Sequence, residues 1–159
     1  MFKVGEKICY PLYGAGHVKA IAQQDALGKE GLYYTLFFYN DGIKIMVPVD
    51  RARQNGLRHV IQLEETDAVF ARLREECRDE EPNWNRRYRQ NFEKLREGSA
   101  LMVADVVKRL AVREQERGLA PEEQKMFKTA RRCLLGELLM AGCGTEDELE
   151  ARINECLRL

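Results

Sequence analysis

The hydrophobic period of the chain changes once, near residue 60, and this change limits the folds available to it. Up to about residue 61, apolar and β-branched residues occur in short runs separated by glycine turns, which is typical of antiparallel strands. From Thr66 onward, apolar residues recur three and four positions apart, as in amphipathic helices. We therefore expect a two-domain α+β protein. Residues 1–62 should form a small antiparallel β-sheet or barrel, and residues 66–159 a compact all-α domain of about five helices.

Four strands are predicted in the first domain, over residues 8–11, 18–23, 32–39 and 43–49. A loose glycine hairpin at residues 27–31 and a tight Asn-Asp-Gly turn at residues 40–42 connect the later strands. Pro48 has no N–H to donate to a ladder, so the last strand should lie at an edge or end there. Gly14-Ala15-Gly16 has two glycines of a phosphate-binding loop, but no helix follows. We interpret it as a turn that needs positive φ.

Five helices are predicted in the second domain. The first should carry Val69, Phe70, Leu73 and Cys77 on its buried face and end in the acidic run that follows. Typical helix starts and stops bound the others: Asn83 and Gly98 for the second, Ser99 and Gly118 for the third, Pro121 at the start of the fourth, and a Thr145/Glu148 capping box at the fifth.

Charge and composition exclude several classes of protein. The chain has 26 basic and 26 acidic residues, so its net charge does not point to a polyanion partner. Locally, however, residues 75–81 hold five acids and residues 83–97 hold five bases. No stretch approaches the ~18 apolar residues of a membrane span, and the N-terminus lacks the apolar core of a signal peptide. We expect a cytoplasmic protein that does not insert into membranes.

Catalytic and metal chemistry have little support. The chain has five scattered cysteines, never in CxxC spacing: Cys9, Cys77, Cys133, Cys143 and Cys156. Zinc or a disulfide framework is therefore not expected. His17 and His59 have no partner at the spacing of a triad or a metal site. We predict no metal, no cofactor and no enzymatic activity. The enzymatic alternative would need a cysteine nucleophile beside one of these histidines.

The only tryptophan, Trp84, stands at the expected start of the second helix. Three arginines follow it closely: Arg86, Arg87 and Arg89. A large flat ring followed by cations suits a wedge against nucleic acid bases, with the cations on the flanking phosphates. Tyr88, Phe92 and Leu95 continue from Trp84 at helical spacing, so the indole could equally be a core residue or a hydrophobic staple. The residues alone leave both interpretations open.

Two further surfaces are candidates for recognition. Lys125, with other bases of the fourth predicted helix, can extend the phosphate-contacting patch, although a solvated helix face would carry the same residues. The predicted edge strand can accept a partner's strand through main-chain hydrogen bonds, unless it is a protected edge in a small barrel. Its candidate residues are Lys44, Ile45, Met46, Val47 and Pro48.

Short motifs along the whole chain resemble the CarD/CdnL transcription regulators. In the first domain they are Val-Gly-Glu-Lys at residues 4–7, Tyr-Pro at 10–11, Tyr-Gly-Ala-Gly at 13–16 and Met-Val-Pro-Val at 46–49. In the second they are Asn-Trp-Asn-Arg-Arg-Tyr-Arg at 83–89, Glu-Arg-Gly-Leu at 116–119 and Lys-Met at 125–126. The first domain alone is also similar to a module of transcription-repair coupling factors.

This resemblance implies a Tudor-like N-terminal domain that binds the β subunit of bacterial RNA polymerase, with residues 44–48 as the contacting strand. It implies a helical domain that touches promoter DNA in the minor groove, at the upstream edge of the melted bubble. Trp84 would be a wedge there. Arg86, Arg87, Arg89 and Lys125 would hold phosphates without reading sequence.

The expected function is therefore a monomeric transcription regulator, associated with the nucleoid through RNA polymerase, that stabilises the promoter open complex. The alternative is a polymerase-binding interaction module whose helices contact another protein. Under that alternative, Trp84 would be an interface anchor.

Overall fold

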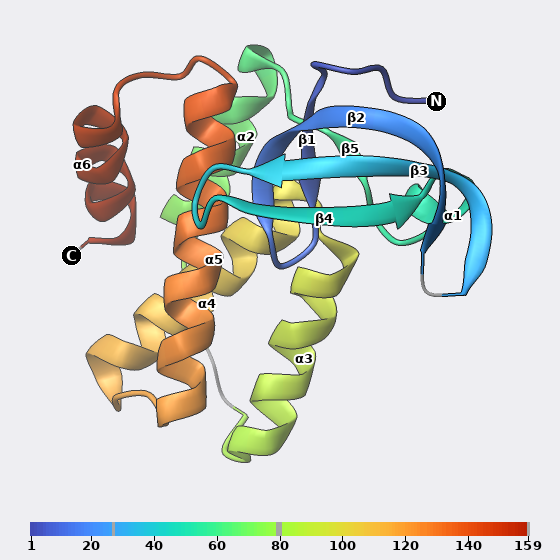
Figure 1. Ribbon diagram of the computed structural model, residues 1–159. Helices are drawn as coiled ribbons and strands as arrows, with labels where there is room; N and C mark the ends of the chain where they lie inside the picture. The colour runs from blue at the N-terminus through green and yellow to red at the C-terminus, as the bar shows by residue number, and fades with distance from the viewer. Residues whose placement is uncertain (27, 79–80, 159) are drawn as a thin grey trace.

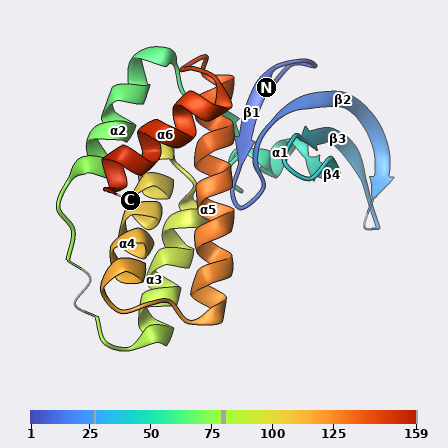
Figure 2. The same ribbon diagram turned by 90° about the vertical axis from the view of Figure 1, so that its left-hand side faces the viewer.

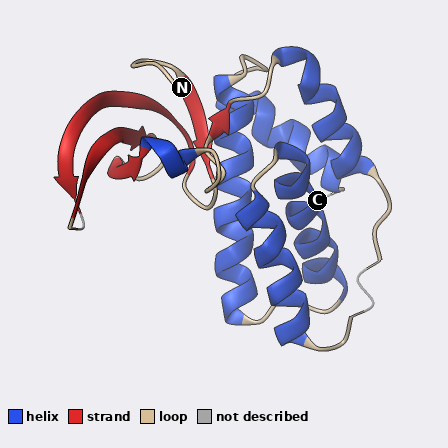
Figure 3. Cartoon of the chain, turned by 90° about the vertical axis from the view of Figure 1, so that its right-hand side faces the viewer, coloured by secondary structure: helices blue, strands red, loops and turns tan. Residues whose placement is uncertain are grey.

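The computed structural model describes residues 1–26, 28–78 and 81–158. The change in hydrophobic period separates two kinds of structure in space. Figure 3 shows the strands, together with a short helix at residues 49–52, on one side of the molecule and the longer helices on the other. Each part has its own apolar core, one built from sheet residues and one from helix residues. No helix in the described ranges is long and apolar enough to cross a bilayer.

The N-terminal part is a five-stranded antiparallel sheet in the order β4-β3-β2-β1-β5. Its strands are β1 (Lys7–Tyr10), β2 (Gly14–Ala26), β3 (Lys29–Phe38), β4 (Ile43–Pro48) and β5 (Arg58–His59), with a short helix α1 (Val49–Ala52) after β4 (Figure 1). Aromatic and β-branched residues of these strands fill the core on one face, as their strand preference predicts. The strand that contains Pro48 lies at an edge of the sheet, as predicted.

Three details of the sheet differ from the prediction. β2 begins at Gly14, not Val18. Gly14 has the positive φ expected of a turn (88°), but Gly16 is already paired to β3. A Cβ on Gly16 would lie 2.0 Å from the carbonyl oxygen of Phe37, so only glycine fits there. Elements as short as α1 and β5 contain too few residues to show a period, and neither was predicted. Of the predicted loose hairpin, residue 27 lies outside the described residues, and β3 already begins at Lys29.

After a 3-10 turn at Leu63–Glu65, the described residues of the C-terminal part form five α-helices: α2 (Thr66–Arg74), α3 (Trp84–Glu97), α4 (Ala100–Glu116), α5 (Pro121–Met140) and α6 (Glu146–Leu157). The side chains of Asn83, Ser99 and Thr145 accept N-terminal hydrogen bonds, which confirms the predicted caps at Ser99 and Thr145. Asn83, predicted as the approximate first residue of its helix, is the cap that precedes it. The prediction for the first helix was too long, because α2 ends at Arg74 and Cys77 lies beyond it.

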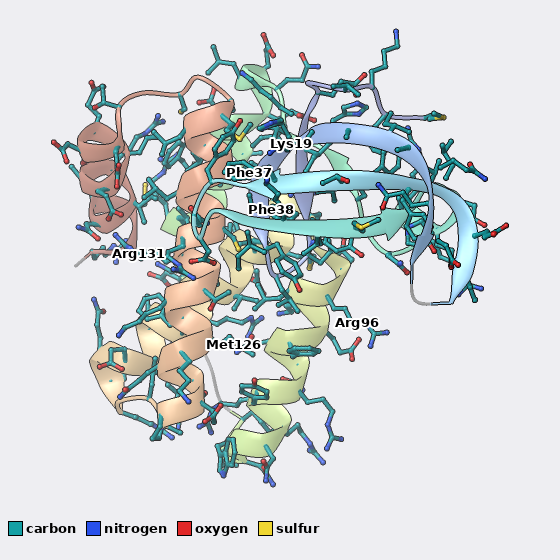
Figure 4. The ribbon with its side chains drawn as sticks, in the orientation of Figure 1. Lys19, Phe37, Phe38, Arg96, Met126 and Arg131 are labelled. Carbon is teal, nitrogen blue, oxygen red and sulfur yellow. The ribbon has the colours of Figure 1, made fainter. Side chains whose placement is uncertain are left out.

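α4 is the central helix of this part, since it packs against α2, α3, α5 and α6. α5 lies between the other helices and the sheet, and it contacts β2 directly (Figure 2). The N-terminal turns of α3 and α5 lie at the end of the helical part remote from β5 (Figure 1). Figure 4 shows Met126 of α5 on the side that faces α3.

A buried carboxylate fixes the sheet against the helices. Glu137 of α5 is only 3% exposed and accepts two hydrogen bonds from the Arg58 guanidinium, at 2.5 and 2.8 Å. It also accepts the Ile61 amide at 3.0 Å. Arg58 in turn donates to the carbonyl oxygen of Gly98, at the end of α3, at 3.0 and 2.9 Å. Because a bidentate pair with a buried carboxylate tolerates little displacement, this contact favours one relative orientation of the two parts.

Candidate functional site

Trp84 is the first residue of α3, and the local sequence explains why the helix begins there. Asn83 has an extended backbone, and its side chain accepts the Arg86 amide at 3.2 Å. Pro82 precedes Asn83, and a proline disfavours helical backbone at the residue before it, so a helix does not run into this segment from its N-terminal side. An N-terminal residue has no preceding helical turn to cover it, and Trp84 remains 44% exposed. The indole is therefore not a core residue.

Trp84 belongs to a row of three rings along one side of α3, which we call the aromatic row (Trp84, Tyr88 and Phe92). Trp84 meets Tyr88 edge to face, with centroids 6.4 Å apart and an interplanar angle of 72°. Tyr88 stacks on Phe92 at 6.3 Å and 16°. Tyr88 and Phe92 are half-buried against the helical core. The row therefore runs from a fixed inner ring to an exposed outer one.

The inner face of α3 carries Arg87, Asn91 and Leu95, which are 5%, 3% and 4% exposed. Of the apolar residues that follow Trp84 at helical spacing, Leu95 lies fully inside, and Tyr88 and Phe92 are half-buried against the helical core. Helical spacing allowed either face to point inward, and the sequence did not show that a charged residue could be buried. Arg87 can be buried because its acidic partner, Glu123, is buried beside it.

Arg87 is a structural residue and not part of an exposed basic patch, contrary to the prediction. Its guanidinium donates to both carboxylate oxygens of Glu123, at 3.3 and 3.0 Å. It also donates to the carbonyl oxygens of Glu81 and Pro82, each at 3.0 Å. Glu123 is 0% exposed and lies in the first turn of α5. A guanidinium bound in this way has no free surface for a phosphate.

The remaining predicted cations are exposed around the start of α3. Arg86 has a side chain 68% exposed and a loose contact to Glu81 at 3.6 Å, and Arg89 is also exposed. The Arg87–Glu123 pair brings the first turn of α5 to the same end, where Lys125 is 76% exposed and lies 3.4 Å from Glu122. Trp84 and three of the four predicted cations are therefore exposed, Arg86 and Arg89 on α3 and Lys125 near the start of α5.

Further along α5, a hollow of about 450 Å³ is bordered by four bases. They are Lys125, Lys128, Arg131 and Arg132. Three of them have acidic partners, because Lys125 lies 3.4 Å from Glu122, Arg131 donates to Glu150 at 2.8 Å and Arg132 lies 3.3 Å from Asp41. Lys125, in the first turns of α5, is the most exposed of these three, with 76% of its side chain exposed against 19% for Arg131 and 55% for Arg132.

The edge strand β4 divides its predicted contact residues between two faces. Lys44 and Met46 are exposed, whereas Ile45 and Pro48 are half-buried. Val47 is 3% exposed and belongs to the core of the sheet, so its side chain cannot touch a partner. Only its main chain, at the open edge of β4, remains available.

A second cation joins Lys44 on this surface. The adjacent ammonium group of Lys44 lowers the pKa of Lys19. Lys19 lies at an irregularity of β2 between Val18 and Ala20, where the register with β3 shifts. A bulge of this kind has no sequence signal in this chain, so Lys19 was not predicted. Figure 4 labels Lys19 on β2 and Phe37 on β3, and Phe37 pairs with Lys44 in the ladder.

In the described part of the chain, neither histidine is hydrogen-bonded to a cysteine. Burial raises the pKa of Cys9 well above its ordinary value, and it raises the pKa of Cys133 to about 11. Both thiols therefore carry less thiolate at neutral pH than a free cysteine. The ring of His17 bonds to the Tyr39 hydroxyl at 2.7 Å, and the ring of His59 bonds to Glu6 at 2.6 Å. These contacts occupy one ring nitrogen of each histidine.

Comparison with protein families identifies both parts. Residues 68–154 match the family described as "CarD, C-terminal domain", and residues 2–61 match the "CarD-like/TRCF RID domain". The chain belongs to the CarD family. A similar relative is the "Putative transcription factor YdeB" of Bacillus subtilis (strain 168), which is 26% identical over 151 residues, covering 95% of this chain and 99% of that one.

Among solved structures, CarD itself provides a neighbour. The solution NMR structure of the 72-residue N-terminal domain of Myxococcus xanthus CarD is 29% identical, with a TM-score of 0.32. The match covers 37% of this chain and 79% of that one. Membership of the CarD family makes this protein a CarD-like transcription factor that interacts with RNA polymerase, and it points to a regulator rather than to an enzyme.

Proposed function

We propose that this CarD-like protein binds the RNA polymerase β subunit through its sheet and stabilises the promoter open complex with Trp84. The observation that carries the proposal is the 44% exposed indole at the first turn of α3, beside the exposed bases Arg86, Arg89 and Lys125. A ring at a helix end, with cations around it, is suited to a junction between paired and unpaired DNA.

Trp84 acts as a wedge in the minor groove at the upstream edge of the bubble. Inserting a side chain between base steps costs unstacking energy, and this cost is lowest where the duplex is already distorted. Aromatic stacking on a base contributes about 1–3 kcal/mol. A contribution of that size shifts the equilibrium between closed and open complexes by roughly one to two powers of ten.

The exposed bases hold the phosphates next to the wedge and do not read sequence. Arg86, Arg89 and Lys125 fill this role, and Arg87 does not, because its guanidinium is bound to Glu123. Three cations on a chain of zero net charge give weak binding to free DNA that depends strongly on salt. The protein therefore depends on polymerase to bring it to the promoter.

Docking on polymerase uses the open edge of β4. Exposed Lys44 and Met46 supply side-chain contacts, and the main chain of residues 45–48 supplies hydrogen bonds for strand addition. The neighbouring Lys19 makes this surface basic. Because Arg58 and Glu137 fix the sheet against the helices, docking at β4 also orients Trp84 and raises its effective concentration at the fork.

We assign the two tasks to separate domains. Residues 1–62 contain the whole sheet with its core and bind the β subunit, and residues 66–159 contact the DNA. One copy of the chain is sufficient for both contacts, so it acts as a monomer. Its place of action is the cytoplasm, on promoter DNA of the nucleoid, together with RNA polymerase.

The half-life of open complexes after addition of a competitor tests this proposal. Wild-type protein should lengthen the half-life, and Trp84→Ala should remove about tenfold or more of that effect at equal polymerase binding. Leu101→Ala is the matched control, because Leu101 is a large apolar residue of α4 with a similar exposure of 46%. An equal loss in both variants, or no loss with Trp84→Ala, would contradict the wedge. The latter result would favour the alternative, in which the helices contact another protein.

A further inference from the structure

We infer that Arg87, Tyr88 and Glu123 act together as positioning residues that hold the Trp84 indole in one orientation before DNA arrives. We call these three residues the Trp84 support. This inference rests on the proposed function, which it deepens by explaining how an exposed side chain acts as a stiff wedge. None of the three needs to touch DNA.

The main chain on both sides of Trp84 is fixed by Arg87. Its guanidinium binds the carbonyl oxygens of Glu81 and Pro82, which lie just before the helix, while its own backbone lies one turn into α3. The same guanidinium reaches Glu123 through two hydrogen bonds. The Arg87 guanidinium thus joins three segments at one buried point: the first turn of α3, the segment before it and the first turn of α5.

Glu123 completes this junction from the side of α5. Besides the two bonds from Arg87, its carboxylate accepts the Ala120 amide at 3.3 Å, as in a capping box. It is 0% exposed, so water does not weaken these interactions. Lys125 lies two residues further along. The junction therefore fixes the distance between the wedge and a phosphate-binding base on another helix.

Tyr88 holds the ring itself. The indole can reach three staggered χ1 positions, and an exposed aromatic side chain would otherwise exchange among them. The edge-to-face contact at 6.4 Å favours the position in which the indole lies against Tyr88. Tyr88 cannot yield easily, because Phe92 stacks behind it and both rings pack on the helical core.

Support of the indole by Tyr88 should change the half-life of the open complex by a measurable factor. A wedge that samples three orientations with equal weight is in the productive one for about a third of the time. Its apparent strength is reduced by the same factor, so support from Tyr88 is worth up to about threefold in open-complex half-life. Loss of the ring in Trp84→Ala costs about tenfold or more. The two effects differ enough to be separated in one assay.

The direct test uses the free, full-length protein, because Trp84 is the only tryptophan of the chain. Time-resolved fluorescence anisotropy of the indole reports its local motion without DNA or polymerase. Tyr88→Leu removes the ring contact, and Tyr88→Phe retains it. We expect a larger fast, local component of the decay in Tyr88→Leu and a wild-type decay in Tyr88→Phe.

The Arg87–Glu123 junction requires a variant that does not leave a buried charge alone. Arg87→Met/Glu123→Gln removes both charges, retains an acceptor for the Ala120 amide and keeps similar volume. Circular dichroism and urea denaturation of this double variant test whether it folds. Arg87→Lys is a second variant, which keeps the charge but cannot form the same fork of hydrogen bonds. Both should increase the local motion of the indole. Arg86→Met/Arg89→Met is the matched control and should leave it unchanged.

The inference is overturned if the indole moves equally in wild type, Tyr88→Leu and Arg87→Met/Glu123→Gln, or if the control variant loosens it as much. The proposed function fails separately, when Trp84→Ala leaves the open-complex half-life unchanged. A looser indole in the support variants, together with a half-life reduced by up to about threefold, would confirm the inference.

Discussion

Trp84→Ala should cost only modest folding stability, and the expected size follows from the exposure of the indole. An aromatic side chain that is fully packed buries roughly 150–250 Å². With 44% of Trp84 exposed, about half of that area, ~100 Å², is removed from water in the fold. At ~25 cal/mol per Å² this area contributes about 2.5 kcal/mol.

That figure is an upper bound, because an extended reference chain overstates the area buried on folding by roughly 10–40%. We therefore expect Trp84→Ala to lower the free energy of unfolding by about 1.5–2 kcal/mol. A core aromatic behaves differently. Phe70 is 0% exposed, and Phe70→Ala should cost about 3–5 kcal/mol because it leaves a cavity as well.

The assay is urea denaturation followed by circular dichroism, since the variant lacks the tryptophan that fluorescence would report. Trp84→Ala, Phe70→Ala and wild type are compared with a common slope. A loss in Trp84→Ala as large as that in Phe70→Ala would show that the indole is a core residue. The wedge would then be refuted on stability grounds alone, whatever the effect on promoter complexes.

Three further outcomes are expected. Lys44→Glu/Met46→Asp should weaken binding to the polymerase β subunit in a pull-down and leave the fold intact; unchanged binding would remove β4 from the interface. Arg86→Glu/Arg89→Glu should shorten open-complex half-life most at low salt, because exposed charges are screened at high salt; half-lives equal to wild type at low salt would exclude both arginines. Burial raises the pKa of Cys133 from 9.0 to about 11, so the folded state keeps a proton that the unfolded chain loses and stability falls as the pH rises from 9.0 to about 11. Cys133→Ala should reduce that decline in a pH series of unfolding midpoints, and an identical decline would argue against the buried thiol.

Most of the fold could be predicted from the sequence because its signals are local. The change of period marked the passage from sheet to helices, and residues such as Asn83, Ser99 and Thr145 marked helix starts by hydrogen bonds that span three residues. Elements of two to four residues, such as β5, carry no period and were missed. β5 exists because it pairs with β1 far along the chain, which a local pattern does not record.

The candidate site was only partly predictable for the same reason. The exposure of Trp84 agrees with the prediction of a wedge, but Arg87 was placed with the wrong group of residues. Its role depends on Glu123, 36 residues away, and only the packing of α3 and α5 against α4 brings the two together. Lys19 lies at an irregularity of β2 that has no sequence signal. Side chains whose role depends on distant partners require the structure.

The central claim is that Trp84 acts at the upstream edge of the promoter bubble. Hydroxyl-radical footprinting of polymerase on one promoter tests it most directly, with no added protein, with wild type and with Trp84→Ala. The account predicts that wild type adds protection confined to the upstream edge, and that Trp84→Ala binds polymerase but weakens this protection. Added protection elsewhere on the promoter, or upstream protection that is the same in Trp84→Ala, would contradict the account.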